Sequence, residues 1–160
     1  MENPRTGIGF DAHRFADGRR LVLGGVEITG ERGLLGHSDA DVLTHAVADA
    51  LLGAVADGDI GAHFPDSDAR WKDADSIELL RAVVDRLTKV GRRVGNVDVT
   101  VMAEAPRLAP HVPGMRARLA EAMGIAPAAV SVKATTVEGM GALGRGEGIA
   151  AMAVASVVSM

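Results

Sequence analysis

Apolar residues recur with helical spacing between residues 42 and 55. They fall at positions 42, 43, 46, 47, 50, 51, 54 and 55, which marks one face of an α-helix. Ser38 and Asp41 form a capping-box-like Ser-x-x-Asp at the start of this helix. Five residues fall on its other side: Asp41, Thr44, His45, Ala48 and Asp49.

A second helical pattern covers residues 76–90. Ile77, Leu80 and Val83 belong to its apolar face, and Gly91 is placed to end it. Between the two helices, residues 57–75 are polar and carry turn signals, which indicates a mobile surface loop. Three prolines, at positions 106, 110 and 113, then shape a loop before a short helix over residues 115–123.

Alternating and continuous apolar runs predict strands. Residues 97–102 and 130–135 alternate as strands do, and residues 21–28 form a hairpin at an edge, with Gly24 and Gly25 in its turn. The continuous apolar run over residues 149–158 is typical of a strand buried on both faces.

The segment GFDAHRF, residues 9–15, predicts the first strand. Because side chains alternate along a strand, Ile8, Phe10 and Ala12 share one face, while Asp11 and His13 share the other. The apolar face is expected to pack on the core. Alone, Asp-x-His is a weak signal, and a surface acid beside a solvated histidine is its simplest interpretation.

The order of these elements predicts a single α+β domain over residues 1–160. Its mixed β-sheet would have helices packed on one face, in a ferredoxin-like arrangement. A chain of 160 residues is long enough for one core. With 48% hydrophobic but only 2% aromatic residues, that core must consist mainly of small and aliphatic side chains.

Charge and composition exclude several function classes. A net charge of −4 argues against a nucleic-acid or anionic-membrane surface, so a phosphate ligand would need metal ions or local cations. Because cysteine is absent, any metal must be held by nitrogen and oxygen. No signal peptide, transit peptide or membrane-spanning run is recognisable, and a cytoplasmic location is therefore expected.

Two groups of residues carry candidate chemistry. Asp11, His13 and His45 would form a two-nitrogen, one-oxygen set suited to an open zinc site, although spacing alone cannot bring them together. The run from Lys133 to Glu138 offers a cation, two hydroxyls and a carboxylate, which suits a phosphate with a hard cation. Solvated histidines, and threonines chosen for β propensity, remain open as alternatives.

Six blocks of this sequence resemble the 2-C-methyl-D-erythritol 2,4-cyclodiphosphate synthases of the non-mevalonate isoprenoid pathway. They cover nearly the whole chain in the order and spacing of that family: GFDAHRF, GLLGHSDADVLTHAVADALLGA, GDIGAHFPDSD, GNVDVTVMAEAPRLAPHVPGMR, VSVKATTVEGMG and GRGEGIAAMAV. The resemblance includes both candidate groups, and it raises the metal interpretation above its alternatives.

The resemblance implies a cyclising lyase that acts on 4-diphosphocytidyl-2-C-methyl-D-erythritol 2-phosphate and releases CMP. It implies Zn²⁺ on Asp11, His13 and His45, and a second ion, Mg²⁺ or Mn²⁺, on Glu138 and the substrate phosphates. His37 and Thr136 would stabilise the transition state. A homotrimer with active sites between subunits is also implied.

The implied substrate contacts form several groups. Asp11, His13, His37 and Ser38 surround the metal, and Lys133 would sit near the phosphates with the 135–138 segment. The erythritol and ribose contacts would be Asp59, Ile60, Gly61, Phe64, Pro65, Asp66, Ser67 and Asp68. Cytosine would lie against Ala103, Glu104, Ala105, Pro106, Arg107, Leu108 and Ala109, largely through backbone groups. The remaining implied contacts are Thr135, Thr136, Val137, Glu138, Ala142 and Arg145.

The chain departs from the family near its end. Gly141-Ala142-Leu143 stands where an aromatic residue is frequent, close to Arg145 and Glu147. In the family these residues lie near a central trimer cavity proposed to take isoprenoid diphosphates, so the grip on that partner is weakened here. Ile8 stands where some relatives have histidine.

Two alternative functions remain open on the residues alone. A metal-dependent phosphohydrolase would use water as nucleophile and give a linear phosphate. A trimeric module that binds isoprenoid diphosphates without turnover would release no CMP, although the intact Asp11, His13, His45 and Glu138 argue against it.

Overall fold

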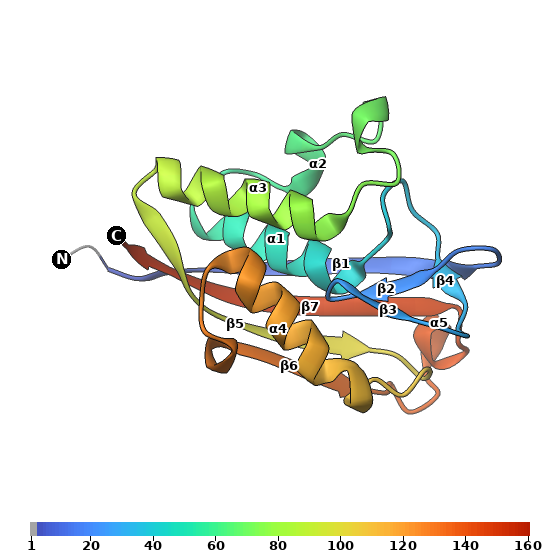
Figure 1. Ribbon diagram of the computed structural model, residues 1–160. Coiled ribbons are helices and arrows are strands. Elements are labelled where there is room, and N and C mark those ends of the chain that lie inside the picture. The colour runs from blue at the N-terminus through green and yellow to red at the C-terminus, as the bar shows by residue number, and fades with distance from the viewer. Residues whose placement is uncertain (1–2) are drawn as a thin grey trace.

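The computed structural model describes residues 3–160 and is built on one five-stranded sheet. Figure 1 shows this sheet as a single twisted layer with the long helices on one side. From edge to edge its strands are β4 (Gly33–Leu34), β1 (Arg5–Ala16), β7 (Gly148–Ser159), β5 (Arg92–Met102) and β6 (Val130–Thr135). The predicted α+β class, with a mixed sheet and helices on one face, is confirmed.

The strand directions correct the expected ferredoxin-like arrangement. β7 is antiparallel to both β1 and β5, so β1 and β5 are parallel with β7 between them, whereas β6 pairs parallel with β5 at the outer edge. A ferredoxin-like fold would need the chain order β-α-β-β-α-β. Here both helical crossings come before β6, and no long helix separates β6 from β7.

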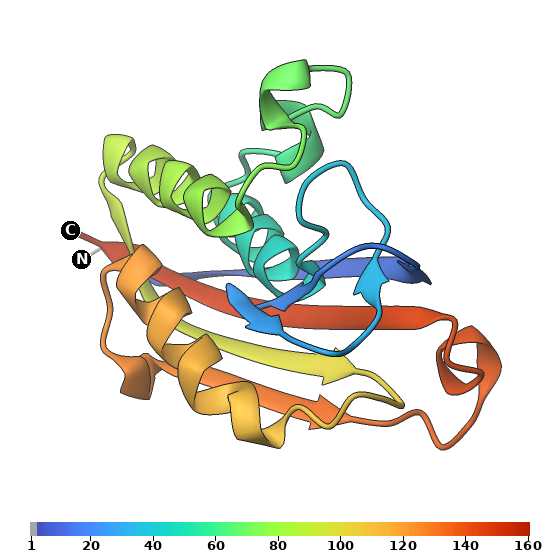
Figure 2. The same cartoon turned by 45° about the vertical axis from the view of Figure 1, so that its right-hand side comes forward.

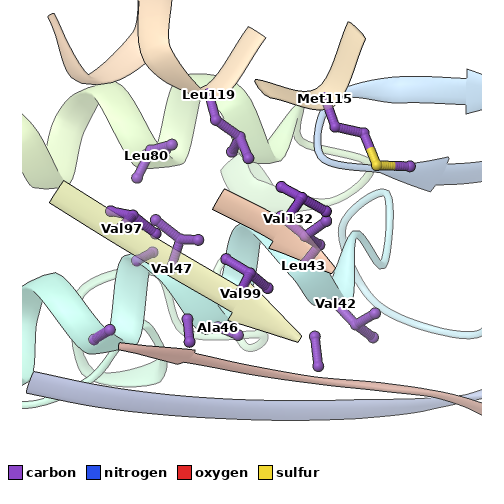
Figure 3. Packing of buried hydrophobic residues seen from close by; sticks show 14 of the residues in the cluster. Val42, Leu43, Ala46, Val47, Leu80, Val97, Val99, Met115, Leu119 and Val132 are labelled. Carbon is purple, nitrogen blue, oxygen red and sulfur yellow. The ribbon is translucent and has the colours of Figure 1, made fainter. Parts of the chain in front are cut away.

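Three helices cover the sheet and form the core with it. Figure 2 shows α1 lying over the β1 half and α4 over the β5–β6 half, and α3 packs against both helices and against β5. The close view in Figure 3 shows Leu43 and Val47 of α1 packed with Val99 of β5, under Leu119 of α4. The helices span Val42–Ala54 (α1), Ser76–Lys89 (α3) and Val112–Met123 (α4).

The helix predictions hold with shifted ends. The helix predicted at 115–123 begins three residues earlier, at Val112, because Pro113 falls in its first turn, where a missing N–H costs nothing. The predicted 57–75 loop contains two short helices. These and the other short helices are α2 (Ile60–His63), η1 (Ala69–Trp71), η2 (Ala109–His111), η3 (Pro127–Ala129) and α5 (Gly141–Gly144).

The first strand faces the opposite way from our expectation. Ile8 is 64% and Phe10 55% exposed, whereas the side that carries Asp11 and His13 is turned towards α1. The reason lies in Gly7 and Gly9, because a Cβ on Gly9 would stand 1.9 Å from the Ala46 carbonyl oxygen of α1. Helix and strand approach so closely only where the strand has no side chain.

Gly9→Ala is therefore expected to destabilise the fold by about 3 kcal/mol, because the new Cβ meets helix backbone that cannot move aside. Urea unfolding monitored by circular dichroism measures this. Gly53→Ala is the matched control, since a Cβ there meets nothing closer than 3.9 Å and alanine favours the α1 helix. Equal urea midpoints of unfolding for the two variants would show that Gly9 is not needed for the close contact between β1 and α1.

Two further burial predictions are wrong. β7 is not buried on both faces, because Met152 and Val154 are 41% and 46% exposed on the side away from the helices. Conversely, the side of α1 that was expected to avoid the core is buried, with Thr44 fully enclosed and His45 only 7% exposed. Helix α1 packs against β1 and β7 on one side and against α3 and α2 on others, so only Asp49 and Gly53 are not buried.

Asp41 alone caps α1, which corrects the predicted capping box. Its carboxylate accepts hydrogen bonds from the Thr44 backbone N–H (2.9 Å) and hydroxyl (2.7 Å). It also accepts the N–H groups of Gly24 (2.9 Å) and Gly25 (2.8 Å). These two glycines form the turn of the predicted hairpin, β2 (Leu21–Leu23) and β3 (Val26–Ile28), which is a separate two-stranded sheet and not an edge of the main one.

Within residues 3–160 no helix combines the length and apolar character that crossing a membrane requires.

Candidate active site

Asp11, His13 and His45 meet between β1 and α1. Asp11 Oδ2 lies 2.9 Å from His45 Nδ1 and 3.1 Å from His13 Nε2. One ligand atom from each of the three residues lies within 4.8 Å of the other two. The close β1–α1 packing at the strand glycines is what brings a helix histidine within reach of two strand side chains. Spacing could not predict this convergence.

In both imidazoles, the ring nitrogen that does not face Asp11 already has a hydrogen-bond partner. His13 Nδ1 lies 2.6 Å from the Leu35 carbonyl oxygen, which can only accept, so this nitrogen carries the hydrogen. His45 Nε2 lies 2.8 Å from Ser76 Oγ and 3.1 Å from Ser38 Oγ. The nitrogens left over point at the Asp11 carboxylate. In neutral imidazoles three lone-pair donors would thus converge, and this set fits a divalent cation such as Zn²⁺.

Electrostatics favour the ionised carboxylate at this point. Burial of Asp11 opposes ionisation, but hydrogen bonds and positive charge from His13 and His45 outweigh it and hold the pKa of Asp11 well below its usual range. The hydrogen bond to Asp11 raises the pKa of His13 against the opposing effect of its own burial. Asp11 is therefore a permanent anion, and the site attracts cations.

A pocket of about 260 Å³ opens over this cluster. Four residues expected to contact substrate, Ile60, Gly61, Phe64 and Asp66, line it together with the cluster. Pro65, Ser67 and the carboxylates of Asp59 and Asp68 do not line it. The complete lining is Asp11, His13, Gly36, His37, Ser38, His45, Ile60, Gly61, Phe64, Asp66, Trp71 and Leu79.

Two of the loop acids act as caps. Asp59 accepts the Ala62 N–H at the start of α2 (2.9 Å), and Asp68 accepts the Arg70 N–H (3.0 Å) while it pairs with the Arg70 guanidinium. Asp49, which follows His45 by one turn of α1, accepts the Ile60 N–H (2.8 Å) and so ties α2 to the helix that carries His45. Burial and the nearby Asp59 and Asp11 raise the pKa of Asp49.

Two buried side-chain nitrogens within residues 3–160, His37 Nε2 and Trp71 Nε1, have no hydrogen-bond partner. Both residues line the pocket. A buried polar nitrogen without a partner costs free energy unless a bound group or water satisfies it. The wall of the pocket therefore keeps hydrogen-bonding capacity for a ligand. The sequence pattern gave no sign of Trp71.

The other predicted residues form a second cluster at the ends of β5 and β6. The Ala103 N–H donates to the Thr135 carbonyl oxygen (3.0 Å), so the 103–109 and 135–138 segments leave the sheet side by side. Glu104 Oε1 accepts the N–H groups of Val137 (3.1 Å) and Gly139 (3.0 Å). This carboxylate holds the turn in which Glu138 adopts a φ of 54°.

The two clusters do not meet within one chain. The register aligns Ala12 with Ala150, Ala150 with Met102, and Met102 with Thr135. Thr135 therefore lies level with the Asp11 end of β1, but three strand spacings away, which is about 14 Å at the usual interstrand distance. Neither Thr136 nor Glu138 lines the first pocket of the same chain.

Comparison with known proteins places the chain in a family. The model of the YgbB family matches residues 4–158. A 2-C-methyl-D-erythritol 2,4-cyclodiphosphate synthase from Halalkalibacterium halodurans is 58% identical over 154 residues, which are 96% of this chain and 98% of that protein. The chain belongs to the 2-C-methyl-D-erythritol 2,4-cyclodiphosphate synthase (YgbB) family. The expected family membership is confirmed.

Solved structures agree with this assignment. A 2C-methyl-D-erythritol-2,4-cyclodiphosphate synthase in a CDP-bound form superposes with a TM-score of 0.88 at 33% identity, over 96% of this chain and all of that one. The bifunctional IspDF of Campylobacter jejuni gives a TM-score of 0.95 at 40% identity over 99% of this chain. This chain spans only 43% of that longer protein.

Three residues that the synthase resemblance implied as ligand contacts are engaged elsewhere. Both oxygens of Asp98 bind Lys133 Nζ (2.7 and 2.6 Å), so Lys133 lies against β5 and not beside the first pocket. Arg145 pairs with Glu147 (2.6 Å). Ala142 lines another hollow, of about 570 Å³ beside α5, which has His13 in common with the first pocket.

Glu104 gives the second cluster of the synthase a testable structural role. Glu104→Ala should free the Val137 and Gly139 N–H groups, loosen the Glu138 turn and lower kcat about 10-fold, with little change in the unfolding midpoint. Glu104→Gln, whose side-chain amide oxygen can still accept both N–H groups, is the matched control. Unchanged turnover in Glu104→Ala would show that the turn holds its shape without this carboxylate.

Proposed function

We propose that this chain catalyses the metal-dependent cyclisation of 4-diphosphocytidyl-2-C-methyl-D-erythritol 2-phosphate to 2-C-methyl-D-erythritol 2,4-cyclodiphosphate, with release of CMP. The observation that carries the proposal is the convergence of Asp11, His13 and His45 at a pocket, in a member of this family. The reaction makes the chain a phosphorus–oxygen lyase of non-mevalonate isoprenoid biosynthesis.

The main obstacle to the reaction is repulsion between its negatively charged phosphate groups. An oxygen of the 2-phosphate attacks the β-phosphorus in line, a P–O bond forms there, and the bond from the β-phosphorus to the oxygen of the departing CMP breaks. Two unit charges of like sign about 4 Å apart repel by about 4 kcal/mol at an effective dielectric constant near 20. Zn²⁺ on Asp11, His13 and His45, with Mg²⁺ or Mn²⁺ on Glu138, would neutralise and template the diphosphate.

The side chains of this protein then supply position and hydrogen bonds. No general base is needed, because the attacking phosphate oxygen is already ionised. His37, with its buried and unpartnered Nε2, is the proposed donor to developing charge on one side, and Thr136 is the donor on the other. Ser38 would contact a phosphate, and residues 59–61 and 64–68 would hold the erythritol and ribose. The loop 103–109 would take the cytosine.

We propose a homotrimer in which each active site joins the first cluster of one subunit to the second cluster of its neighbour. The separation of about 14 Å across three strands within one chain supports this, since both clusters must reach one diphosphate. The exposed apolar sheet face around Ile8, Phe10, Met152 and Val154 offers the surface that subunits would bury.

Product analysis tests the function. The purified protein, loaded with Zn²⁺ and Mg²⁺, should convert the CDP substrate to equimolar CMP and a cyclic diphosphate, identified by ³¹P NMR and mass spectrometry. Treatment with a chelator should stop the reaction, and added metal should restore it. A linear phosphate product would identify a hydrolase instead. Binding without CMP release would identify a non-catalytic module.

A further inference from the structure

A buried chain of hydrogen bonds runs from Asp39 through Ser76 to His45. Ser76 is only 1% exposed and is the first residue of α3. Its hydroxyl lies 2.8 Å from His45 Nε2 and also bonds Asp39 Oδ1, while its backbone N–H donates to Asp39 Oδ2 (2.9 Å). The proposed function leaves Ser76 and Asp39 without a role.

The Asp39 carboxylate determines which atoms donate and which accept in these hydrogen bonds. Its carboxylate receives the Ser76 N–H, the Asp41 N–H (3.2 Å) and the Ser76 hydroxyl, so it acts only as an acceptor. The Ser76 hydroxyl hydrogen is thereby committed to Asp39. Ser76 Oγ can then only accept from His45, and His45 Nε2 must carry the hydrogen. His45 Nδ1, which lies 2.9 Å from Asp11 Oδ2, is then the nitrogen whose lone pair can bind a cation held between these two residues.

Ser38 cannot fix the tautomer of His45 in this way. Its Oγ lies 3.1 Å from His45 Nε2, and its other contact is the Ala40 N–H at 3.4 Å. No carboxylate fixes its hydroxyl hydrogen, so Ser38 can either donate to His45 or accept from it. Ser38 also lines the pocket, where a ligand can claim its hydroxyl. The tautomer of His45 is therefore decided on the Ser76 side.

The same contact secures the segment behind the pocket. The Asp39 N–H donates to the Ala74 carbonyl oxygen (3.2 Å), and the Asp73 N–H donates to the His37 carbonyl oxygen (2.8 Å). These bonds join the end of the 64–75 segment to residues 37–39. The Ser76–Asp39 contact therefore lies beside the point where the loop is attached to the residues behind the pocket.

We propose that Ser76 and Asp39 are positioning residues that hold His45 in the Nε2–H tautomer and so direct its Nδ1 lone pair at the metal. The inference rests on the proposed metal chemistry, because only a bound cation can lie between the Nδ1 lone pair and the Asp11 carboxylate. Residues that bond the far nitrogen of a metal-binding histidine commonly change metal affinity 10- to 100-fold when they are removed.

The tautomer is tested in the Zn²⁺-loaded protein. ¹⁵N-labelled histidine is observed about two pH units above the ordinary histidine pKa of about 6.5, where neutral rings distinguish protonated from unprotonated nitrogens. The signals missing from His45→Gln identify His45. Wild type should show Nε2–H. Asp39→Asn, whose amide can donate to Ser76 Oγ and so free the Ser76 hydroxyl to donate to His45 Nε2, should weaken Zn²⁺ binding. A wild-type Nδ1–H tautomer would overturn the proposal.

Metal affinity gives the second readout. Ser76→Ala should weaken Zn²⁺ binding at least 10-fold in a chelator competition, and Ser76→Thr, which keeps the hydroxyl, should restore it. Ser156→Ala is the matched control, because its hydroxyl makes two bonds to Asn96 on the far sheet face. Wild-type affinity in Ser76→Ala would refute the role. A wild type that binds Zn²⁺ more tightly than Ser76→Ala but forms no cyclic product would refute the proposed function alone.

Discussion

His45→Gln should lower turnover by about 1,000-fold, equal to about 4 kcal/mol of transition-state stabilisation, because it removes one of three ligands from a site whose ion must neutralise several phosphate charges. Zn²⁺ content after dialysis should fall below stoichiometric levels in parallel. Glutamine is preferable to alanine here, since His45 is enclosed and a small side chain would leave a cavity under Ser76.

The control for His45→Gln is His111→Gln. His111 precedes α4 and lies outside both clusters, so this variant should keep wild-type zinc content and turnover. Circular dichroism of both variants checks that the fold is retained. Stoichiometric zinc in His45→Gln would remove His45 from the ligand set, whatever the effect on turnover.

Local patterns in the sequence predict most of the fold. Helical spacing located α1 and α3, and alternation located β5 and β6, because each residue's neighbours along the chain determine these signals. The predictions that were wrong concern which faces are buried, and these depend on packing between distant segments. Ile8 and Phe10 look like core residues, but the glycines between them admit α1 on the opposite face. A glycine in a strand indicates close contact with a helix only when the helix that packs on it is known.

The candidate site divides in the same way. The types and order of Asp11, His13 and His45 could be found in the sequence, and the family resemblance placed them correctly in one group. Ser76 and Asp39 were missed, because a serine or aspartate near the start of a helix is ordinarily explained as a cap. Only the fold reveals that the Ser76 hydroxyl lies against a histidine of another helix.

Mixed trimers should recover activity that both parent variants lack. His45→Gln destroys the first cluster and Glu138→Gln the second, so each homotrimer has only defective sites. If each site takes its two clusters from neighbouring subunits, co-expression of the two variants yields sites in which both halves are intact, about a quarter of the total for random assembly. Selection by two tags removes the homotrimers, and each mixed trimer has one intact site in three, so turnover of the selected mixture should rise to about a third of wild type.

The activity of the mixed trimers separates two explanations of how clusters about 14 Å apart across three strands could act on one diphosphate. If a loop movement within one chain closed the gap, every site would belong to a single subunit, and no mixture of the variants could contain an intact one. Mixed trimers that stay as inactive as their parents would therefore exclude a shared site. Recovery requires that the diphosphate is held by Asp11, His13 and His45 of one subunit and by Glu138 of another.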